Sequence, residues 1–214
     1  MQKTGTIQAA YFREPKPAAI RLWHWLTFLF FTGSVITVLF ASTLFQMKSN
    51  VGMIQEQVQS KGGTVTVQQA RSVAHEYSDK LWMLHKYFGF GLSILLLWRI
   101  ITEVMLAKEG RLRTRVRNAL NYPAKDGEQK HYLWVQYGYV IFYILFITMS
   151  LTGLILAFED IKWLEPLHDL AQDTHSIVQW GLYAYVLFHL GGVIRADLTR
   201  YGGIISRMIN GKNS

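Results

Sequence analysis

Four histidines lie inside the most apolar stretches of this chain, where an unpaired polar side chain is costly. They are His24, His85, His175 and His189. His175 and His189 stand fourteen positions apart in one stretch. At 3.6 residues per turn this spacing returns both side chains to nearly the same helix face, about 21 Å apart along the axis and thus across most of a bilayer core. Two imidazoles on one stripe predict two separate groups to bind.

The composition indicates a protein embedded in a lipid bilayer. Half of the 214 residues are hydrophobic, only 17% are charged, and seven are Trp. Each of the four nearly uncharged segments exceeds the roughly 20 residues that a spanning helix needs. They cover residues 20–45, 81–106, 132–158 and 170–194. We therefore expect an all-α integral membrane protein, a four-transmembrane-helix bundle forming a single domain over residues 1–214.

Two features limit the alternatives. The chain has no cysteine, which excludes thiolate-ligated iron–sulfur clusters, disulfides and haem attached covalently through C-x-x-C-H. The basic residues before the first apolar stretch could suggest a signal peptide. That stretch is too long for one, however, and it contains His24, so we expect a retained first span.

The distribution of charge predicts the orientation. Residues 107–131 form a strongly basic connection that we assign to the cytoplasm, and both tails are also basic, so both termini should be cytoplasmic. The connection before the last span carries five acidic residues against Lys162 and should be external. Binding to anionic lipid headgroups explains the basic residues, and we expect no nucleic acid partner. The basic residues of the connection are Arg111, Arg113, Arg115, Arg117, Lys125 and Lys130, with Arg99 and Lys108 at its entry, and those of the tails are Lys3, Arg13, Lys16, Arg21, Arg195, Arg200, Arg207 and Lys212.

Two further segments flank the spans. Residues 49–80 should form an external loop, in which Thr66 and Gln69 have the spacing of a capping box and predict a short helix leading into the second span. Residues 196–214 have apolar side chains at helical spacing and should form an interfacial segment, weakened as a helix by Gly202 and Gly203.

Membrane depth predicts which histidines pair. With the N-terminus inside, His24 and His189 both lie near the cytoplasmic face, whereas His85 and His175 both lie near the external face. Helical bundles build cofactor sites from such facing side chains. We therefore predict two non-covalent bis-histidine haems, each with six-coordinate iron suited to electron transfer. Alternative interpretations are histidines that hydrogen-bond between helices, and zinc, although structural zinc gathers its ligands at one point.

The remaining histidines and several glycines have weaker signals. His75, His131 and His168 should lie at the surface, with His168 as an alternative outer ligand because it precedes His175 by seven residues. Gly89, Gly138 and Gly153 could provide flat helix surface for a macrocycle or simply close helix packing.

Several motifs resemble the bacterial di-haem cytochrome b561 and hydrogenase cytochrome b superfamily, which includes membrane subunits of nickel–iron hydrogenases and formate dehydrogenases. The similarity runs from about Tyr11 to Lys212, and its closing part resembles hydrogenase cytochrome b subunits in particular. The motifs are Arg21-Leu22-Trp23-His24-Trp25-Leu26, His85-x-x-x-Gly89, His175-x13-His189, Arg195-Ala196-Asp197-Leu198 and Ile205-Ser206-Arg207-Met208-Ile209-Asn210-Gly211.

This resemblance implies a multi-pass subunit of the bacterial inner membrane with two b haems, whose axial ligands match His24, His85, His175 and His189. It would carry electrons between a periplasmic dehydrogenase or hydrogenase and the quinone pool, as the electron-transfer subunit of a quinone-reactive oxidoreductase. Arg21, Arg99 and Arg195 are candidates for contacts to haem propionates or quinone. The alternative function is a stand-alone cytochrome b561 that exchanges electrons between a small oxidant such as superoxide and quinone. A homo-oligomer is compatible with either.

Overall fold

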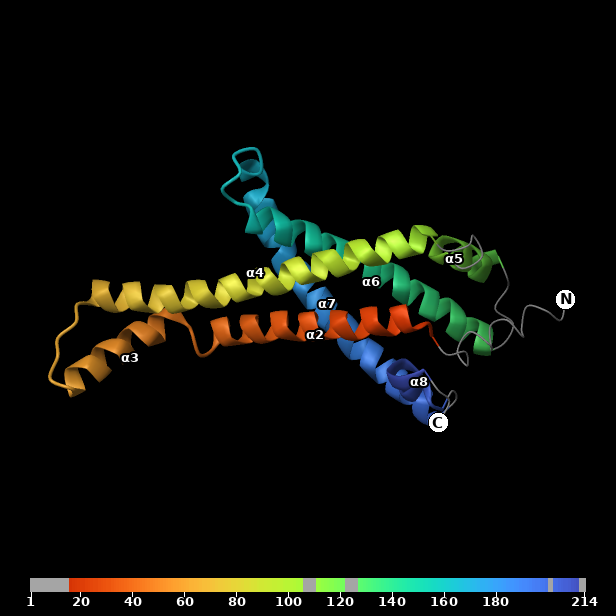
Figure 1. Ribbon diagram of the computed structural model, residues 1–214, viewed down its shortest axis with the longest axis horizontal. Helices are drawn as coiled ribbons and strands as arrows, with labels where there is room; N and C mark the ends of the chain where they lie inside the picture. Colours follow the sequence, from red (N-terminus) through yellow and green to blue (C-terminus); the bar gives the residue numbers. More distant parts are fainter. Residues whose placement is uncertain (1–15, 106–110, 122–126, 200–201, 212–214) are drawn as a thin grey trace. The chain divides into compact units, whose positions relative to one another are not determined.

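The computed structural model describes residues 16–105, 111–121, 127–199 and 202–211, and every regular element in them is helical (Figure 1). Part of the predicted orientation rests on residues that lie outside these ranges, namely Lys3, Arg13, Lys108, Lys125, Arg200 and Lys212. The elements are α2 (Ala18–Ser42), α3 (Met47–Ser60), α4 (Val67–Met105), α5 (Leu112–Asn121), α6 (Gly127–Ala157), the 3-10 turn η2 (Glu165–Leu167), α7 (His168–Thr199) and α8 (Ile204–Asn210).

The four predicted spans are confirmed as helices long and apolar enough to cross a membrane. Their ends differ from the prediction by five residues or fewer, except that the second helix begins fourteen residues earlier, at Val67. The first span ends at Ser42, because the amides of Thr43 and Phe45 turn back to the carbonyl of Phe40. The last helix continues past the predicted end at residue 194 to Thr199, so it includes part of the segment we expected to be interfacial.

The segment predicted to form an external loop, residues 49–80, is largely helical. The capping box is confirmed: the amide of Gln69 donates to Thr66 Oγ1 (3.2 Å), and the amide of Thr66 donates to Gln69 Oε1 (2.9 Å). The helix that starts there is not a separate short helix but runs unbroken into the second span as α4. No Gly or Pro interrupts it between Val67 and Gly89. Its 39 residues extend over about 58 Å, about twice the bilayer core, so the polar residues 67–80 are in excess of the length that a span needs. Residues 47–60 form a further helix, α3, that the sequence analysis did not predict.

The chain divides into two compact units, which we describe separately. The first, here called the α2–α4 unit, comprises Leu26–Ser93. The second, called the α6–α7 unit, comprises Met1–Trp25 and Ile94–Ser214, and so includes the start of α2 and the end of α4.

Two glycines allow close packing in the α2–α4 unit, where α2 and α4 run side by side (Figure 1). The ring of Phe88 on α4 lies over Gly33 of α2, and reciprocally the ring of Phe30 lies over Gly91. The two rings meet edge to face with centroids 6.0 Å apart. Small residues at such crossings let helix backbones approach closely where lipid supplies no hydrophobic driving force.

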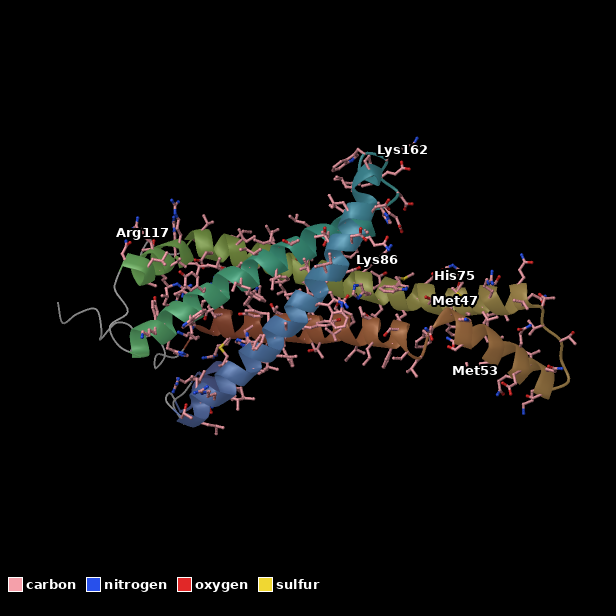
Figure 2. All side chains as sticks on the ribbon, turned by 180° about the vertical axis from the view of Figure 1, so that it is seen from behind. Met47, Met53, His75, Lys86, Arg117 and Lys162 are labelled. Carbon is pink, nitrogen blue, oxygen red and sulfur yellow. The ribbon has the colours of Figure 1, made fainter. Side chains whose placement is uncertain are left out.

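In the α6–α7 unit, α6 and α7 pack along each other, and Gly181 makes room for Leu145. The predicted cytoplasmic connection contains helix α5, which packs on the first half of α6 with Ala119 buried and the Arg115 guanidinium 5.5 Å from the Tyr139 ring. Figure 2 shows Arg117 of α5 and Lys162 of the loop after α6 pointing outward near opposite ends of α6.

Gly202 and Gly203, which were expected to weaken the C-terminal segment as a helix, lie at a helix boundary. Gly203 adopts a left-handed conformation (φ 82°) immediately before α8, and Gly211 does the same (φ 74°) immediately after it. Glycine adopts this conformation without steric cost. The two glycines therefore define α8 as a separate short helix.

Gly33→Ala should destabilise the protein, because the new Cβ would lie 2.5 Å from Phe88 Cζ and force the ring to move. Overpacking of this kind costs about 1–3 kcal/mol. Thermal denaturation of the detergent-purified protein should show a lower Tm. Gly52→Ala is the control, since its Cβ would meet nothing within 4 Å in the exposed helix α3. Equal melting of the two variants would contradict this account of the crossing.

Candidate functional site

The α6–α7 unit brings two of the candidate ligands together. His24, in the first turns of α2, and His189, late in α7, have ring centroids 6.2 Å apart and ring planes at 62°. Imidazole nitrogens bind transition metals at about 2 Å, so one ion held between two rings needs centroids about 6 Å apart. The observed separation fits one metal ion bound from both sides.

Aromatic side chains lie against the His24–His189 pair, here called the inner pair because the sequence predicts it near the cytoplasmic face. The Tyr185 ring is nearly parallel to the His189 ring (9°, centroids 6.1 Å apart), and Trp25 meets His24 edge to face at 5.4 Å. Within the described residues, no hydrogen bond reaches a ring nitrogen of either histidine. The two rings thus make ring-packing contacts with Tyr185, with Trp25 and with each other.

Helix α8 is tied to the same region. The indole Nε1–H of Trp25 donates to the carbonyl of Met208 at 3.0 Å, and Arg21 lies against Gly211. Because Trp25 is the neighbour of His24 in the chain, this bond places the C-terminal helix next to the inner pair.

A small pocket of about 170 Å³ opens near the start of α2, and its polar lining includes Trp23, Arg99 and Thr102. The Arg99 guanidinium lies 5.9 Å from the Trp23 ring centroid and 3.0 Å from the Glu103 carboxylate. Of the three arginines proposed to contact propionates or quinone, Arg99 thus has its charge balanced by a neighbouring acid.

His85, in the α2–α4 unit, is anchored to two hydroxyl groups of α2. Its Nδ1 lies 2.9 Å from Thr37 Oγ1 and 3.3 Å from Ser34 Oγ. Thr37 Oγ1 donates its hydrogen to the Ser34 carbonyl at 2.6 Å, so it accepts the hydrogen of Nδ1. A neutral imidazole protonated at Nδ1 carries its lone pair on Nε2, which is the form a metal ligand requires.

His175, in the α6–α7 unit, has the same arrangement. Its Nδ1 lies 3.0 Å from Thr152 Oγ1, which donates to the Thr148 carbonyl at 2.8 Å and therefore accepts from Nδ1. The next residue, Gly153, gives the ring its space, since a Cβ there would lie 3.2 Å from His175 Cε1. The third span, which has no internal histidine, thus contributes a hydroxyl and a glycine.

His85 and His175 belong to different units, and their pairing stays a prediction. The expected surface position of two other histidines is confirmed. His75 lies 3.1 Å from Asp79 with both side chains exposed, and His168 lies 3.7 Å from the exposed Glu159 carboxylate. His168 faces acidic groups of the connection before α7, and His131 is half-buried.

The other glycines singled out from the sequence have open surroundings. A Cβ at Gly89 or Gly138 would meet nothing within 4 Å, in contrast to Gly153. Such uncrowded surface is what a flat macrocycle needs and equally what lipid would cover.

Sequence reasoning missed the hydroxyl partners Ser34, Thr37 and Thr152. A signal was available, because each is a polar side chain within an apolar span. Polar residues inside a membrane need partners, so a search for hydroxyls in the spans would have found candidates. Only the fold shows which of them face a histidine.

Four helices long and apolar enough to cross a membrane define a multi-pass membrane protein. A comparison with protein families matches residues 17–211 to prokaryotic cytochrome b561, and the chain belongs to this family. It is accordingly a membrane protein that binds haem b and transfers electrons. Neither a curated protein nor a solved structure matches the chain significantly.

Trp25→Phe should loosen α8, because the variant keeps an aromatic ring but loses the hydrogen bond to the Met208 carbonyl, about 1 kcal/mol. Hydrogen–deuterium exchange in detergent should show faster exchange of the amides of residues 204–210. Trp134→Phe, at an exposed position of α6, is the matched control. Unchanged exchange in Trp25→Phe would show that other contacts hold the helix.

Proposed function

We propose that this protein is a membrane-bound b-type cytochrome that carries electrons through two bis-histidine haems between a periplasmic donor and the quinone pool. His24 and His189 hold the inner haem, and His85 and His175 hold the outer one. The observation that carries the proposal is the 6.2 Å separation of the His24 and His189 rings, which suits one iron between them.

The donor chemistry supports this assignment. Bound haem supplies a reversible one-electron iron couple. The two imidazoles of each pair would hold the haem iron from the protein side, and such a donor set would favour electron transfer over binding of oxygen. The hydroxyl partners of His85 and His175 keep Nε2 in the form that can bind iron.

The spacing of two histidines on helix α7 favours two separate haem sites over a single one. His175 and His189 are fourteen residues apart on this helix, which corresponds to about 21 Å of rise. Electrons that enter at the outer site can therefore cross most of the bilayer to the inner site.

The distribution of charge supports the proposed orientation of the protein in the membrane. The basic helix α5 and the basic tails favour the cytoplasmic side of a bacterial inner membrane, and the acidic connection before α7 favours the periplasmic side. Both termini then lie in the cytoplasm, and the His24–His189 pair lies inside the membrane near its cytoplasmic face.

Quinone reduction would occur near the inner pair, and the pocket beside Trp23 and Arg99 is the candidate site for the quinone ring. Two electrons delivered in succession and two protons taken up from the cytoplasm convert the quinone to the quinol. A hydrogenase-type dehydrogenase is the proposed donor. Quinone reduction by the purified protein with superoxide alone would favour the stand-alone alternative, although the acidic external connection would repel that anion.

Replacing single ligands should remove single haems. Pyridine haemochrome analysis of the wild type should give about two haems b per chain, because each bis-histidine pair holds one. His24→Ala or His189→Ala should remove one haem, and His85→Ala or His175→Ala the other, as distinguished by low-spin EPR signals. His75→Ala and His168→Ala are the controls and should retain both. Loss of both haems from every single ligand change would contradict the assigned pairs.

Gly153→Ala should disturb only the outer haem, because the added Cβ displaces the His175 ring by a few tenths of an ångström. We expect one EPR signal to shift while the other stays. Gly138→Ala, on the same helix with open space at its Cβ, should change neither. If both variants give the wild-type spectrum, His175 is not a ligand of the outer haem.

A further inference from the structure

We propose that Thr37 and Thr152 are positioning residues that hold His85 and His175 in one tautomer and thereby lower the reduction potential of the haem bound there. This inference rests on the proposed function, in which these histidines are the outer ligands. Neither threonine would touch the haem iron, and each acts through its histidine.

The direction of both hydrogen bonds follows from a proton count. A hydroxyl has one hydrogen, and in each threonine the protein's own helix takes it: Thr37 donates to the Ser34 carbonyl and Thr152 to the Thr148 carbonyl. Threonine in a helix favours a rotamer in which its hydroxyl donates to the carbonyl three or four residues earlier. Each oxygen can then only accept from the imidazole, so Nδ1 of both histidines must be the protonated nitrogen.

Burial makes these bonds strong. Thr37 is 3% exposed and Thr152 is 8% exposed, which places both among the few buried polar residues of the described chain. An imidazole N–H inside a membrane span is costly without an acceptor, so the bond to the buried threonine oxygen is retained through fluctuations of the helices. Ser34 Oγ, 3.3 Å from the same nitrogen of His85, adds a second acceptor on α2.

The inner pair lacks this support. His24 and His189 pack against the Trp25 and Tyr185 rings, and within the described residues neither histidine has a hydrogen bond at a ring nitrogen. Donation of the second N–H makes a ligating imidazole a stronger electron donor, which stabilises the oxidised metal. The outer haem should therefore have the lower potential.

This difference has a functional consequence. Electrons that enter at the outer haem would move to a site of higher potential when they reach the inner haem. The two threonines thus favour electron flow from the periplasmic side towards quinone, using residues that bind no cofactor themselves.

The test is redox potentiometry of the haem-loaded wild type and of Thr37→Val and Thr152→Val, which replace a hydroxyl by a methyl of similar size. We expect two haems in each variant, an upward shift of the lower midpoint, an unchanged upper midpoint, and a changed EPR signal of one haem only. Thr37→Ser and Thr152→Ser should restore both properties. Thr148→Val is the matched control, because its hydroxyl bonds only the Ile144 carbonyl in the same helix.

Retention of both haems with unchanged midpoints in the valine variants would overturn the inference and leave the proposed function intact. If a valine variant loses its haem, recovery of haem and midpoint in the serine variant supports the inference, and failure to recover either overturns it. Failure of the proposed function is recognised separately, by retention of both haems in His85→Ala and His175→Ala.

Discussion

An imidazole inside a membrane span needs partners for both of its nitrogens, and this constraint organises the protein. Hydrocarbon offers no hydrogen bonds, so a histidine there persists only if the fold supplies a donor, an acceptor or a metal. The chain meets the requirement in two ways. Thr37 and Thr152 accept from Nδ1 of His85 and His175, whereas His24 and His189 face each other across a separation that fits one metal ion.

The helices position these groups by their length and by close packing. Helix α7 carries two histidines on nearly one face, and α6 beside it contributes Thr152 and the space at Gly153. In the other unit, the reciprocal contacts of Gly33 with Phe88 and of Gly91 with Phe30 bring α2 and α4 close enough for Thr37 to reach His85. The same crossing that packs the helices therefore also orients a ligand.

The sequence was most informative where a pattern is local. Apolar length predicted the four spans, and the spacing of Thr66 and Gln69 predicted a helix start, because both depend on neighbouring residues alone. It was least informative in the connections, where α3 and α5 form and where α4 extends unbroken from the capping box. These segments are polar on average and too short to be spans, although apolar residues do recur at helical spacing in them, as Val51, Ile54 and Val58 do in α3.

By itself, the sequence determined the spanning segments, the absence of thiol chemistry and the four histidines within the spans, since these follow from residue type and spacing. Only the tertiary structure decided which side chain meets each histidine. Hydrogen bonds and metal bonds depend on atoms within about 3 Å, and residues such as Thr152 and His175 are 23 positions apart in the chain. Helix crossings bring them together, and those crossings depend on packing that no local pattern records.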